Sequence, residues 1–359
     1  MPSSQPRHTL LSLAQDLGVS RATVSNAYNH PEELSAELRV RILARAAELG
    51  YPGPNPAGRQ LRGARVGAVG VLVDQSVSYA FADPAASLLL DGLAEALRPD
   101  GLGLLVHAGN APDTVELAHI RDAAVDAWIV LSLPDGDATI AAARTRGRPL
   151  VVIDQPGLPE LPTVSVEDAE GARVAARHLL EFGHRRIGVL TMPLRPDRHQ
   201  GFADQHRQDG TGYRVMRERL SGVRDELAAA GLDWARVPVM ECALNHPVAA
   251  ARAMTELVTV HPGLTAVIAL SDQVAVGALR AAEDLDLHVP DQLSVIGFDG
   301  APLAGYTHPP LTTITQPIRE KGRVAGELVR TMLRGEPAVA PPAFPVTLTV
   351  RASTGRSAW

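Results

Sequence analysis

The 359-residue chain exceeds the length of one ordinary domain, and its 45% hydrophobic and 21% charged residues are typical of a folded protein with ample apolar core. No apolar run reaches the ~18 residues of a membrane-spanning helix, and the N-terminus lacks a secretory signal, so we expect a cytoplasmic protein with no membrane partner. The single cysteine, Cys242, excludes an intrachain disulfide and a thiolate zinc site, and no cofactor is expected.

The net charge of −6 is unevenly distributed along the chain. Residues 1–65 carry eight arginines against five acidic residues, which leaves this end at +3 and the remainder at −9. A small basic end on an acidic body indicates that the end alone meets a polyanion, although a chance fluctuation would give the same count.

Three short amphipathic helices are predicted near the N-terminus. A tight Gly-Val-Ser turn separates a first helix over residues 9–17 from a second that begins at Ser20, with Val24 and Ala27 turned inward. A third helix follows the N-cap residue Ser35 and ends before a Gly-Tyr pair. This spacing predicts a helix-turn-helix unit.

Apolar β-branched runs alternate with amphipathic stretches from Arg65 onward, among them VGAVGVLVD, PLVVID and LSVIGFDG. Near-continuous apolar strands that alternate with helices predict parallel sheets covered on both faces, and roughly ten strands favour two lobes over one sheet. Ligands of such sheets lie beyond the carboxyl ends of the strands. The residues that end these runs are therefore expected to ring a cleft: Asp74, Asp154, Ser271, Asp272 and Asp299.

Residues 192–213 form a long polar insertion without hydrophobic periodicity. Two interpretations stay open for it, a mobile lid over the cleft and a disordered loop. His199 and His206 lie in this segment, but loop histidines without carboxylate partners at ligand spacing are usually solvated, so no metal site is predicted.

Several segments resemble the lactose/galactose repressor family of bacterial transcription regulators. TLLSLAQDLGVSRATVSNAYN is similar to the family's helix-turn-helix, LSAELRVRILARAAELGY to its third helix, and NPAGRQLR to its hinge helix. The segment from VIALSDQ to TTITQPI is similar to the most distinctive part of its effector domain. The resemblance extends over nearly the whole chain in the expected order.

The resemblance implies an α/β fold: an N-terminal three-helix headpiece and a two-lobed, periplasmic-binding-protein-like effector domain with parallel sheets. Homodimers are the family's usual working form, and no heptad tail for a tetramer is seen. The expected domains are 1–52 for the helix-turn-helix, 53–65 for the hinge with its short helix, and 66–359 for the effector domain. The expected lobes are about 66–166 with 316–341, and about 167–315 with 342–359, with crossings near Glu167, Thr315 and Pro342.

By resemblance, positions 21, 22 and 26 read base edges in the major groove. Arg21 can bind guanine bidentately, Asn26 suits adenine, and Ala22 can touch a thymine methyl. Many family members carry Arg where Asn26 stands, which predicts an unusual half-site, although a capping or phosphate contact is the alternative for Asn26. The full predicted DNA-binding set is Ser20, Arg21, Ala22, Thr23, Ser25, Asn26, Tyr28, Asn29, Arg59, Leu61 and Arg62.

Leu61 lies in a basic linker and has no core to enter unless it packs on the effector domain. In the family, the Leu at this position wedges into the minor groove at the operator centre. Gly58 stands where Ala is common and weakens a helix by about 1 kcal/mol. We therefore expect the hinge helix to form only on DNA.

By resemblance, Asp154, Arg219 and Asp299 contact the effector, and paired hydroxyls of a sugar need such carboxylate and guanidinium partners. The two aromatic residues that follow the first strand are available for stacking. Asp272 has the alternative of only capping a helix, and Arg219 that of a surface arginine. The full predicted ligand-binding set is Tyr79, Phe81, Asp154, Arg219, Ser271, Asp272 and Asp299.

These features predict a sequence-specific transcription regulator, expected to be a repressor, whose operator affinity is controlled allosterically by a small sugar-like effector. Its partners would be double-stranded operator DNA, that effector and a second copy of the chain. The alternative is a small-molecule binding protein or sugar-active enzyme of similar two-lobed fold. The sequence contains no G-x-S-x-G, H-E-x-x-H or P-loop motif, so nothing in it indicates catalysis.

Overall fold

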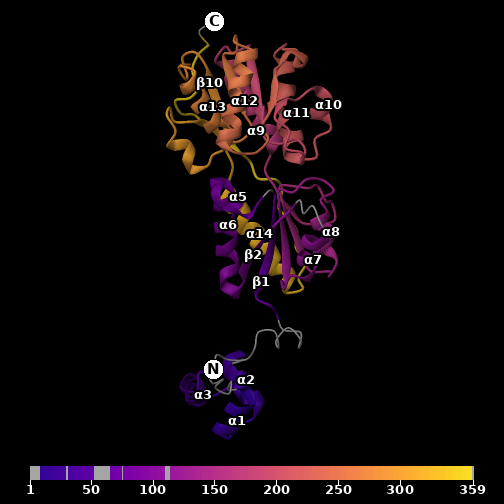
Figure 1. The fold of residues 1–359 in the computed structure, drawn as a ribbon, viewed down its shortest axis with the longest axis vertical. Helices are drawn as coiled ribbons and strands as arrows, with labels where there is room; N and C mark the ends of the chain where they lie inside the picture. The colour runs from indigo at the N-terminus through magenta and orange to yellow at the C-terminus, as the bar shows by residue number, and fades with distance from the viewer. Residues whose placement is uncertain (1–8, 30, 52–64, 75, 110–113, 358–359) are drawn as a thin grey trace, which may run out of the picture. The chain divides into compact units, whose positions relative to one another are not determined.

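The structure is a computed structural model that describes residues 9–29, 31–51, 65–74, 76–109 and 114–357. The chain divides into two compact units, Met1–Val66 and Gly67–Trp359, and Figure 1 follows its course through both. No helix in the described ranges is long and apolar enough to cross a membrane.

The first unit is a cluster of short helices, α1 (Leu10–Leu17), α2 (Arg21–Asn29), η1 (Pro31–Glu33) and α3 (Ala36–Glu48). Thr9 and Ser12 form a capping box at the start of α1, and Gly18 ends this helix with a φ of 65°, a left-handed conformation that glycine adopts without strain. Each of the three α-helices contributes two buried residues to a small common core: Leu13, Ala14, Val24, Ala27, Ile42 and Ala46.

The second unit contains two sheets, each the centre of one lobe. The first lobe holds five parallel strands in the order β2-β1-β3-β4-β5. The apolar residues of β3 and β4, and of β1 from Val69 onward, are buried on both faces, as expected for parallel strands covered by helices, whereas the edge strand β2 is only partly buried. The bounds are β1 (Ala68–Val73), β2 (Gly103–Ala108), β3 (Ala127–Leu131), β4 (Leu150–Ile153) and β5 (Thr163–Val164).

The second lobe holds seven strands in the order β12-β11-β10-β9-β6-β8-β7, with antiparallel strands only at its two edges. The bounds are β6 (Ile187–Thr191), β7 (Gly201–Phe202), β8 (Val239–Glu241), β9 (Ala266–Ala269), β10 (Ser294–Asp299), β11 (Thr312–Thr315) and β12 (Thr347–Thr349).

Helices cover both sheets, and Figure 1 shows α14 lying beside α6 on the first lobe although the two are far apart in sequence. The first lobe carries α5 (Val77–Ala82), α6 (Pro84–Leu97), η2 (Arg98–Asp100), α7 (Thr114–Asp122), α8 (Ala138–Arg144) and α14 (Ile318–Leu333). The second carries α9 (Asp168–Glu181), α10 (Gln205–Asp209), α11 (Arg214–Ala229), η3 (Trp234–Arg236), α12 (Pro247–Val260), α13 (Asp272–Asp284) and η4 (Pro302–Gly305).

Glycines set the close approach of α6 and α14. A Cβ at Gly92 would lie 2.0 Å from the carbonyl oxygen of Arg319, and one at Gly322 would lie 2.1 Å from that of Leu89. Both distances are far below van der Waals contact, so any side chain here would push the helices apart. The contact fixes α14 to the first lobe, although its neighbours in sequence belong to the second.

The chain passes between the sheets three times, at 165–167, 316–317 and 334–346. Two of these passages run side by side, because Val166 and Phe344 form a parallel bridge. The Glu167 amide donates to the Phe344 carbonyl at 3.0 Å, and the Phe344 amide donates to the Ser165 carbonyl at 2.8 Å. Two of the three connections between the lobes are thus held to each other by backbone hydrogen bonds.

The polar insertion over residues 192–213 is an ordered part of the second lobe, not a disordered loop. It contributes β7, which pairs with β8, and the short helix α10. Arg207 binds the fully buried carboxylate of Glu241 and also pairs with Asp197 at 2.7 Å. Leu194 donates its amide to the same Glu241 carboxylate at 2.8 Å, so one buried charge holds both ends of the segment.

Candidate functional site

The outer face of α2 carries the predicted base readers. Arg21 and Ala22 are exposed and Asn26 is half-buried, while Val24 and Ala27 are buried against α1 and α3. The 3.6-residue period of a helix produces this division, because residues three apart share a face.

The side-chain amide of Asn26 is oriented by a neighbouring carboxylate. Its Nδ2 donates to Oε2 of Glu33, in η1, at 2.5 Å. Only the NH₂ group can donate to a carboxylate, so this contact settles which way the amide points. One Nδ2 hydrogen and the Oδ1 acceptor remain for another partner.

Three other residues of the predicted DNA-binding set have local structural contacts. Ser20 Oγ accepts from the Thr23 amide at 3.0 Å and lies 2.8 Å from the Thr23 hydroxyl, which is the pattern of a helix N-cap. The Tyr28 ring packs edge-on against Tyr51, with 6.2 Å between ring centroids. Ser25 is half-buried. The side chain of Asn29, and the linker residues Arg59, Leu61 and Arg62, lie outside the described residues.

A cavity of about 150 Å³ lies between the two lobes of the second unit. The carboxyl ends of strands from both sheets open onto it, as expected for parallel α/β sheets. Its charged and polar lining residues are Asp74, Tyr79, Asp83, Ser132, Asp154, Gln155, Tyr213, Arg219, Asn245, Asp299, Gln316 and Lys321.

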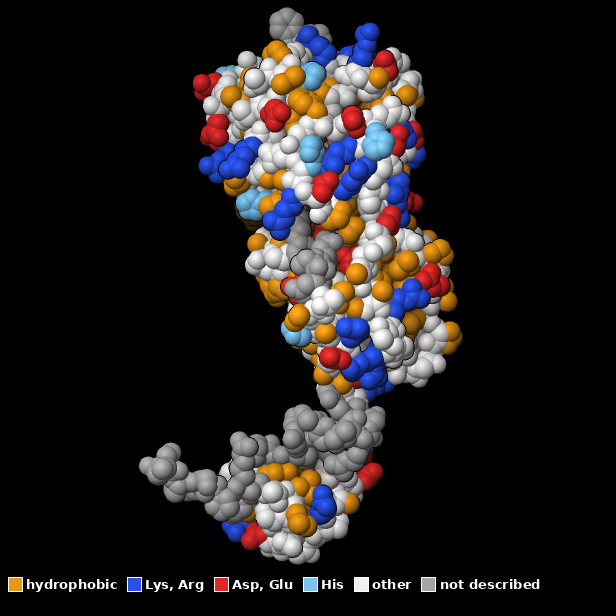
Figure 2. Space-filling model, turned by 45° about the vertical axis from the view of Figure 1, so that its right-hand side comes forward, with side chains coloured by type: hydrophobic (Ala, Val, Ile, Leu, Met, Phe, Trp, Pro, Cys, Tyr) orange, Lys and Arg blue, Asp and Glu red, His pale blue; other side chains and the backbone are white. Residues whose placement is uncertain are grey.

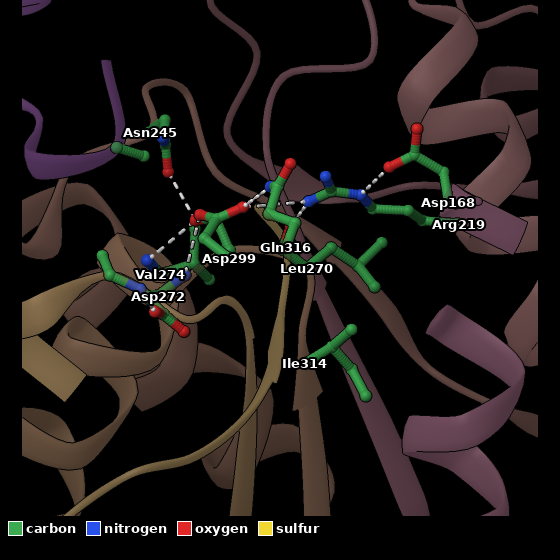
Figure 3. Close-up of polar contacts among 12 residues, drawn as sticks. Asp168, Arg219, Asn245, Leu270, Asp272, Val274, Asp299, Ile314 and Gln316 are labelled. Carbon is green, nitrogen blue, oxygen red and sulfur yellow. Dashed lines mark hydrogen bonds and ion pairs between the residues drawn. The ribbon is translucent and has the colours of Figure 1, made fainter. Parts of the chain in front are cut away.

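Arg219 provides a buried positive charge on the second-lobe wall (Figure 3). Its Nε donates to Oδ1 of Asp168 at 2.8 Å, and its Nη1 donates to the Leu270 carbonyl at 2.7 Å and lies 3.6 Å from Oδ1 of Asp299. The guanidinium also stacks on Phe298, 3.6 Å from the ring centroid. Arg219 is therefore a clamped wall residue and not a surface arginine.

A chain of polar contacts joins Arg219 to the first-lobe wall. Gln316 donates from Nε2 to Oδ1 of Asp299 at 2.8 Å, and its Oε1 accepts from Lys321 Nζ at 2.8 Å. Lys321 in turn pairs with Asp154 at 2.6 Å. Gln316 lies in one of the passages between the lobes, so this network joins both walls through the hinge.

A second group of contacts crosses the cavity directly. Asn245 donates from Nδ2 to the Tyr79 hydroxyl at 2.7 Å and to Oδ2 of Asp83 at 3.2 Å. The Tyr79 hydroxyl donates to the same carboxylate at 2.5 Å. Ser271 holds the other end of the amide, because its hydroxyl donates to Asn245 Oδ1 at 2.6 Å. Burial raises the pKa of Tyr79 well above its ordinary value, so its phenol stays protonated at neutral pH.

The end of the insertion and the start of α11 also bridge the lobes. The Tyr213 hydroxyl donates to Asp74 at 3.2 Å, and Arg214 donates from Nε to the Asp154 carbonyl at 3.0 Å. The Val215 amide donates to Gln155 Oε1 at 2.8 Å. These contacts join the two walls, so they depend on how closely the lobes approach each other.

Three residues of the predicted ligand-binding set do not line the cavity. Phe81 is 63% exposed, because α5 turns Tyr79 inward and a residue two further along a helix points about 200° away. Ser271 is the N-cap of α13 and holds Asn245 from behind. Asp272 accepts from the Thr313 hydroxyl at 2.6 Å and the Ala301 amide at 2.8 Å, which fixes the loop after β10.

Burial changes the proton affinity of two carboxyls, that of Asp299 in the cavity wall and that of Asp272 behind it. It raises the pKa of Asp299 to about 6, with Arg219 opposing the shift. Burial and then the charge of Asp299 raise the pKa of Asp272 to about 8. In both cases the apolar surroundings disfavour the charged form.

Neither a metal nor a reactive thiol is indicated. Within the described part of the chain, no three His, Cys, Asp or Glu side chains are grouped so as to hold a metal ion. Cys242 is buried, and burial raises the pKa of its thiol to about 12, which leaves it protonated and unreactive at neutral pH.

Sequence reasoning missed several cavity residues. Asn245 and Gln316 follow the strands β8 and β11. These strands are too short to stand out as apolar runs in the sequence, so the residues after them were not predicted. Lys321 lies within α14, Asp83 is the N-cap residue of α6, and Tyr213 is the last residue of the polar insertion. No local pattern in the sequence separates these three from surface residues.

Comparison with known proteins agrees with this architecture. A model of the periplasmic binding protein-like domain matches residues 176–354. An HTH-type transcriptional regulator of Mycolicibacterium smegmatis is 40% identical over 336 residues, covering 91% of each chain. The crystal structure of a LacI-family transcriptional regulator from Corynebacterium glutamicum is 34% identical, with a TM-score of 0.74 over 99% of this chain and 100% of that one.

A complex of the transcriptional regulator CelR with cellobiose is 27% identical, with a TM-score of 0.70 over 97% of this chain and 100% of that one. The relatives are regulators of transcription, not enzymes, so the enzyme alternative is set aside. With 40% identity over nine-tenths of its length, the chain belongs to the lactose/galactose repressor (LacI) family of helix-turn-helix transcription regulators.

Proposed function

We propose that this regulator binds its operator as a cytoplasmic homodimer through α2, and that a metabolite whose hydroxyl-rich single ring lies in the cavity between the lobes controls its affinity for DNA. The observation that carries the effector class is the composition of the cavity. Its walls combine four carboxylates with two cations that are both already paired.

The charge of the inner cavity favours an uncharged ring at that place. Asp74, Asp83, Asp154 and Asp299 outnumber Arg219 and Lys321, so an anionic group would meet net repulsion. Carboxylates, amides and guanidinium groups placed side by side are suited to hydroxyls, each of which both donates and accepts. A cavity of about 150 Å³ accommodates one six-membered ring. The CelR complex with cellobiose supports a carbohydrate-like effector.

At the DNA end, the proposed reader of guanine O6 and N7 is Arg21, and its exposure on α2 supports this role. Asn26, oriented by Glu33, keeps one donor and one acceptor, the pair that adenine N7 and N6 require. Ser20 and Thr23 cap the helix and support the reading face. The proposed wedge role of Leu61 concerns a residue outside the described ranges.

The coupling between the two ends is reciprocal. A ligand that changes the lobe spacing changes DNA affinity, and DNA changes ligand affinity by the same factor, typically ~1–3 kcal/mol. The contacts of Tyr213, Arg214 and Val215 across the cleft are those that such a change in spacing would alter.

Selection of binding sites from a random DNA library by the full-length protein tests the DNA-binding proposal. We expect a two-fold related operator, and we expect Asn26→Ala to lose ~1–3 kcal/mol of discrimination at one base pair of each half-site. Gln15→Ala, which removes an exposed amide from α1, is the matched control and leaves the selected sequence unchanged.

A panel of sugars and cyclic polyols tests the effector class. Each compound is added to the protein bound to the recovered operator, and the loss or gain of operator affinity is measured. Asp299→Asn is expected to abolish the response to the active compound while operator binding without ligand persists. Absence of sequence-selective binding at moderate salt, with and without the panel, would contradict the regulator proposal.

A further inference from the structure

The inner cavity adjoins a second, larger hollow, which we call the vestibule. The vestibule has a volume of about 670 Å³ and shares Asp74, Tyr79, Pro193 and Tyr213 with the inner cavity. Its remaining wall comes from α5 and its N-cap residue, the residue that follows β2, the loop after β8 and the insertion. These residues are Ser76, Ser78, Ala82, Gly109, Arg195, Pro196, Arg198, Ala243, Leu244 and His246.

The charge of the vestibule is opposite to that of the inner cavity. Its described lining includes two arginines, Arg195 and Arg198, and a single carboxylate, Asp74, to which the Tyr213 hydroxyl donates. His246 also lines it, with Nδ1 accepting from the Val248 amide at 3.2 Å, so its Nε2 is left to act as a donor. The described surroundings therefore change from acidic in the inner cavity to basic in the vestibule.

The two arginines carry positive charge that no described carboxylate neutralises. Arg195 donates from Nε to the Gly210 carbonyl at 3.1 Å and from Nη2 to the His206 carbonyl at 3.4 Å, both within the insertion. These contacts fix the guanidinium without cancelling its charge. Arg198 makes no hydrogen bond or ion pair with the described residues, and its φ of 56° lies in the left-handed region. That conformation costs a non-glycine residue energy and clusters at functional sites.

Polar contacts around a buried carboxylate order the insertion that carries the two arginines. The fully buried Glu241 binds Arg207 and the Leu194 amide, and Thr211 donates from its hydroxyl to the Leu194 carbonyl at 2.8 Å. Trp234 donates to Gln208 at 3.0 Å from the neighbouring η3. Arg207 is thus neutralised within the fold, while the arginines at the vestibule are not. Figure 2 shows Lys, Arg and His side chains gathered on the second lobe beside its junction with the first.

We propose that the vestibule binds an anionic substituent of the effector, a phosphoryl or carboxylate group, through Arg195 and Arg198, while the effector's hydroxyl-rich ring occupies the inner cavity. This inference rests on the proposed function. Guanidinium groups suit such a partner, because their planar donors match two oxygens of a phosphate or carboxylate at once. The polar insertion then determines whether a sugar that carries an anionic group is bound in preference to its neutral counterpart.

Titration of the full-length protein with inorganic phosphate at constant ionic strength, followed by calorimetry, tests the vestibule alone. We expect the double variant Arg195→Gln/Arg198→Gln to weaken phosphate binding at least tenfold. The matched control is Arg185→Gln/Arg236→Gln. Arg185 donates only to backbone carbonyls and Arg236 is 89% exposed, and this pair is expected to leave binding within twofold. The single variant Arg198→Gln removes a side chain without described contacts, so its weaker binding cannot be ascribed to misfolding.

Comparison of glucose, glucuronate and glucose 6-phosphate separates the two anions, the better-bound one identifying the group that the vestibule accepts. Asp299→Asn alters the inner cavity and is expected to weaken all three sugars but leave inorganic phosphate bound. Equal phosphate affinity in the vestibule variants and their controls, or no phosphate binding by the wild type, overturns the proposal. If phosphate binds as expected but no sugar or polyol of any charge changes operator binding, the proposed effector class is wrong while the proposed anion site is retained.

Discussion

At the scale of single residues, the cavity is organised around charges that have been removed from water. Arg219 is buried between Asp168 and Asp299 and is stacked on Phe298. Removing one partner of a buried ion pair leaves an uncompensated charge and typically costs about 3–5 kcal/mol. Arg219 therefore supports the fold as well as the proposed site, and its substitution is a poor test of ligand binding alone.

The pH dependence of stability should reveal the buried acids. The folded-state pKa values of Asp299 and Asp272, about 6 and about 8, lie above the ordinary value of ~3.9 for an exposed Asp. Their contribution to the free energy of unfolding is therefore fully present below about pH 4 and is lost as the pH rises to 8. For each proton that the folded state binds and the unfolded state does not, the free energy of unfolding falls by about 1.4 kcal/mol per pH unit.

Asp272→Asn is expected to flatten the part of this slope between pH 6 and 8. The measurement is urea unfolding followed by tryptophan fluorescence at several pH values. Asp291→Asn, which removes an exposed carboxyl from the same lobe, is the control and retains the slope. An unchanged slope in Asp272→Asn would show that the proton resides elsewhere.

At the scale of elements, each lobe contains a pair of helices that pack closely at glycines. The α6–α14 pair has no room for a Cβ at Gly92 or Gly322, because a backbone carbonyl of the partner helix occupies that space. The same feature recurs in the second lobe, where a Cβ at Gly222 of α11 would lie 2.1 Å from the Ala169 carbonyl of α9. Each pair thus allows little change in helix spacing.

Gly322→Ala should therefore destabilise the effector domain, although alanine is the better helix former. Overpacking of this kind typically costs ~1–3 kcal/mol. Gly305→Ala is the control, because nothing lies within 4 Å of the added methyl there, and it should change stability by less than about 0.5 kcal/mol. Equal unfolding midpoints for the two variants would contradict this account of the contact.

Sequence patterns predicted the parts of the site that depend on local periodicity. Asp154 and Asp299 were predicted because they end long apolar strands, and the division of α2 into buried and exposed faces follows from helical spacing. Lys321 could not be predicted in this way. It reaches Asp154 only because α14 returns to the first lobe, a contact between residues 167 positions apart. Phe81 was predicted as a wall residue because the short helix α5 was not recognised, and helix geometry turned it outward.

At the scale of the whole molecule, the proposed ligand should stabilise one unit only. The three tryptophans, Trp128, Trp234 and Trp359, all belong to the second unit, so their fluorescence reports on the effector domain. A ligand at 100 times its Kd that binds only the folded state adds about 2.7 kcal/mol to the stability of that domain.

We therefore expect the tryptophan-detected unfolding midpoint to rise with the active compound. The melting of a separately expressed residue 1–52 fragment, followed by circular dichroism where that fragment folds, should not change. Asp299→Asn should remove the shift in the effector domain. A ligand-dependent shift that survives this substitution would place the binding site outside the cavity.

The return of α14 to the first lobe also has a consequence for synthesis on the ribosome. Helix α6 ends at Leu97, but the helix that covers it is not complete until Leu333 has been added. At translation rates of ~5–20 residues per second, the apolar face of α6 waits roughly 12–50 s for its partner. A nascent chain arrested before α14 would expose Leu89 and Leu93, both buried in the finished protein, and would depend on chaperones during that interval.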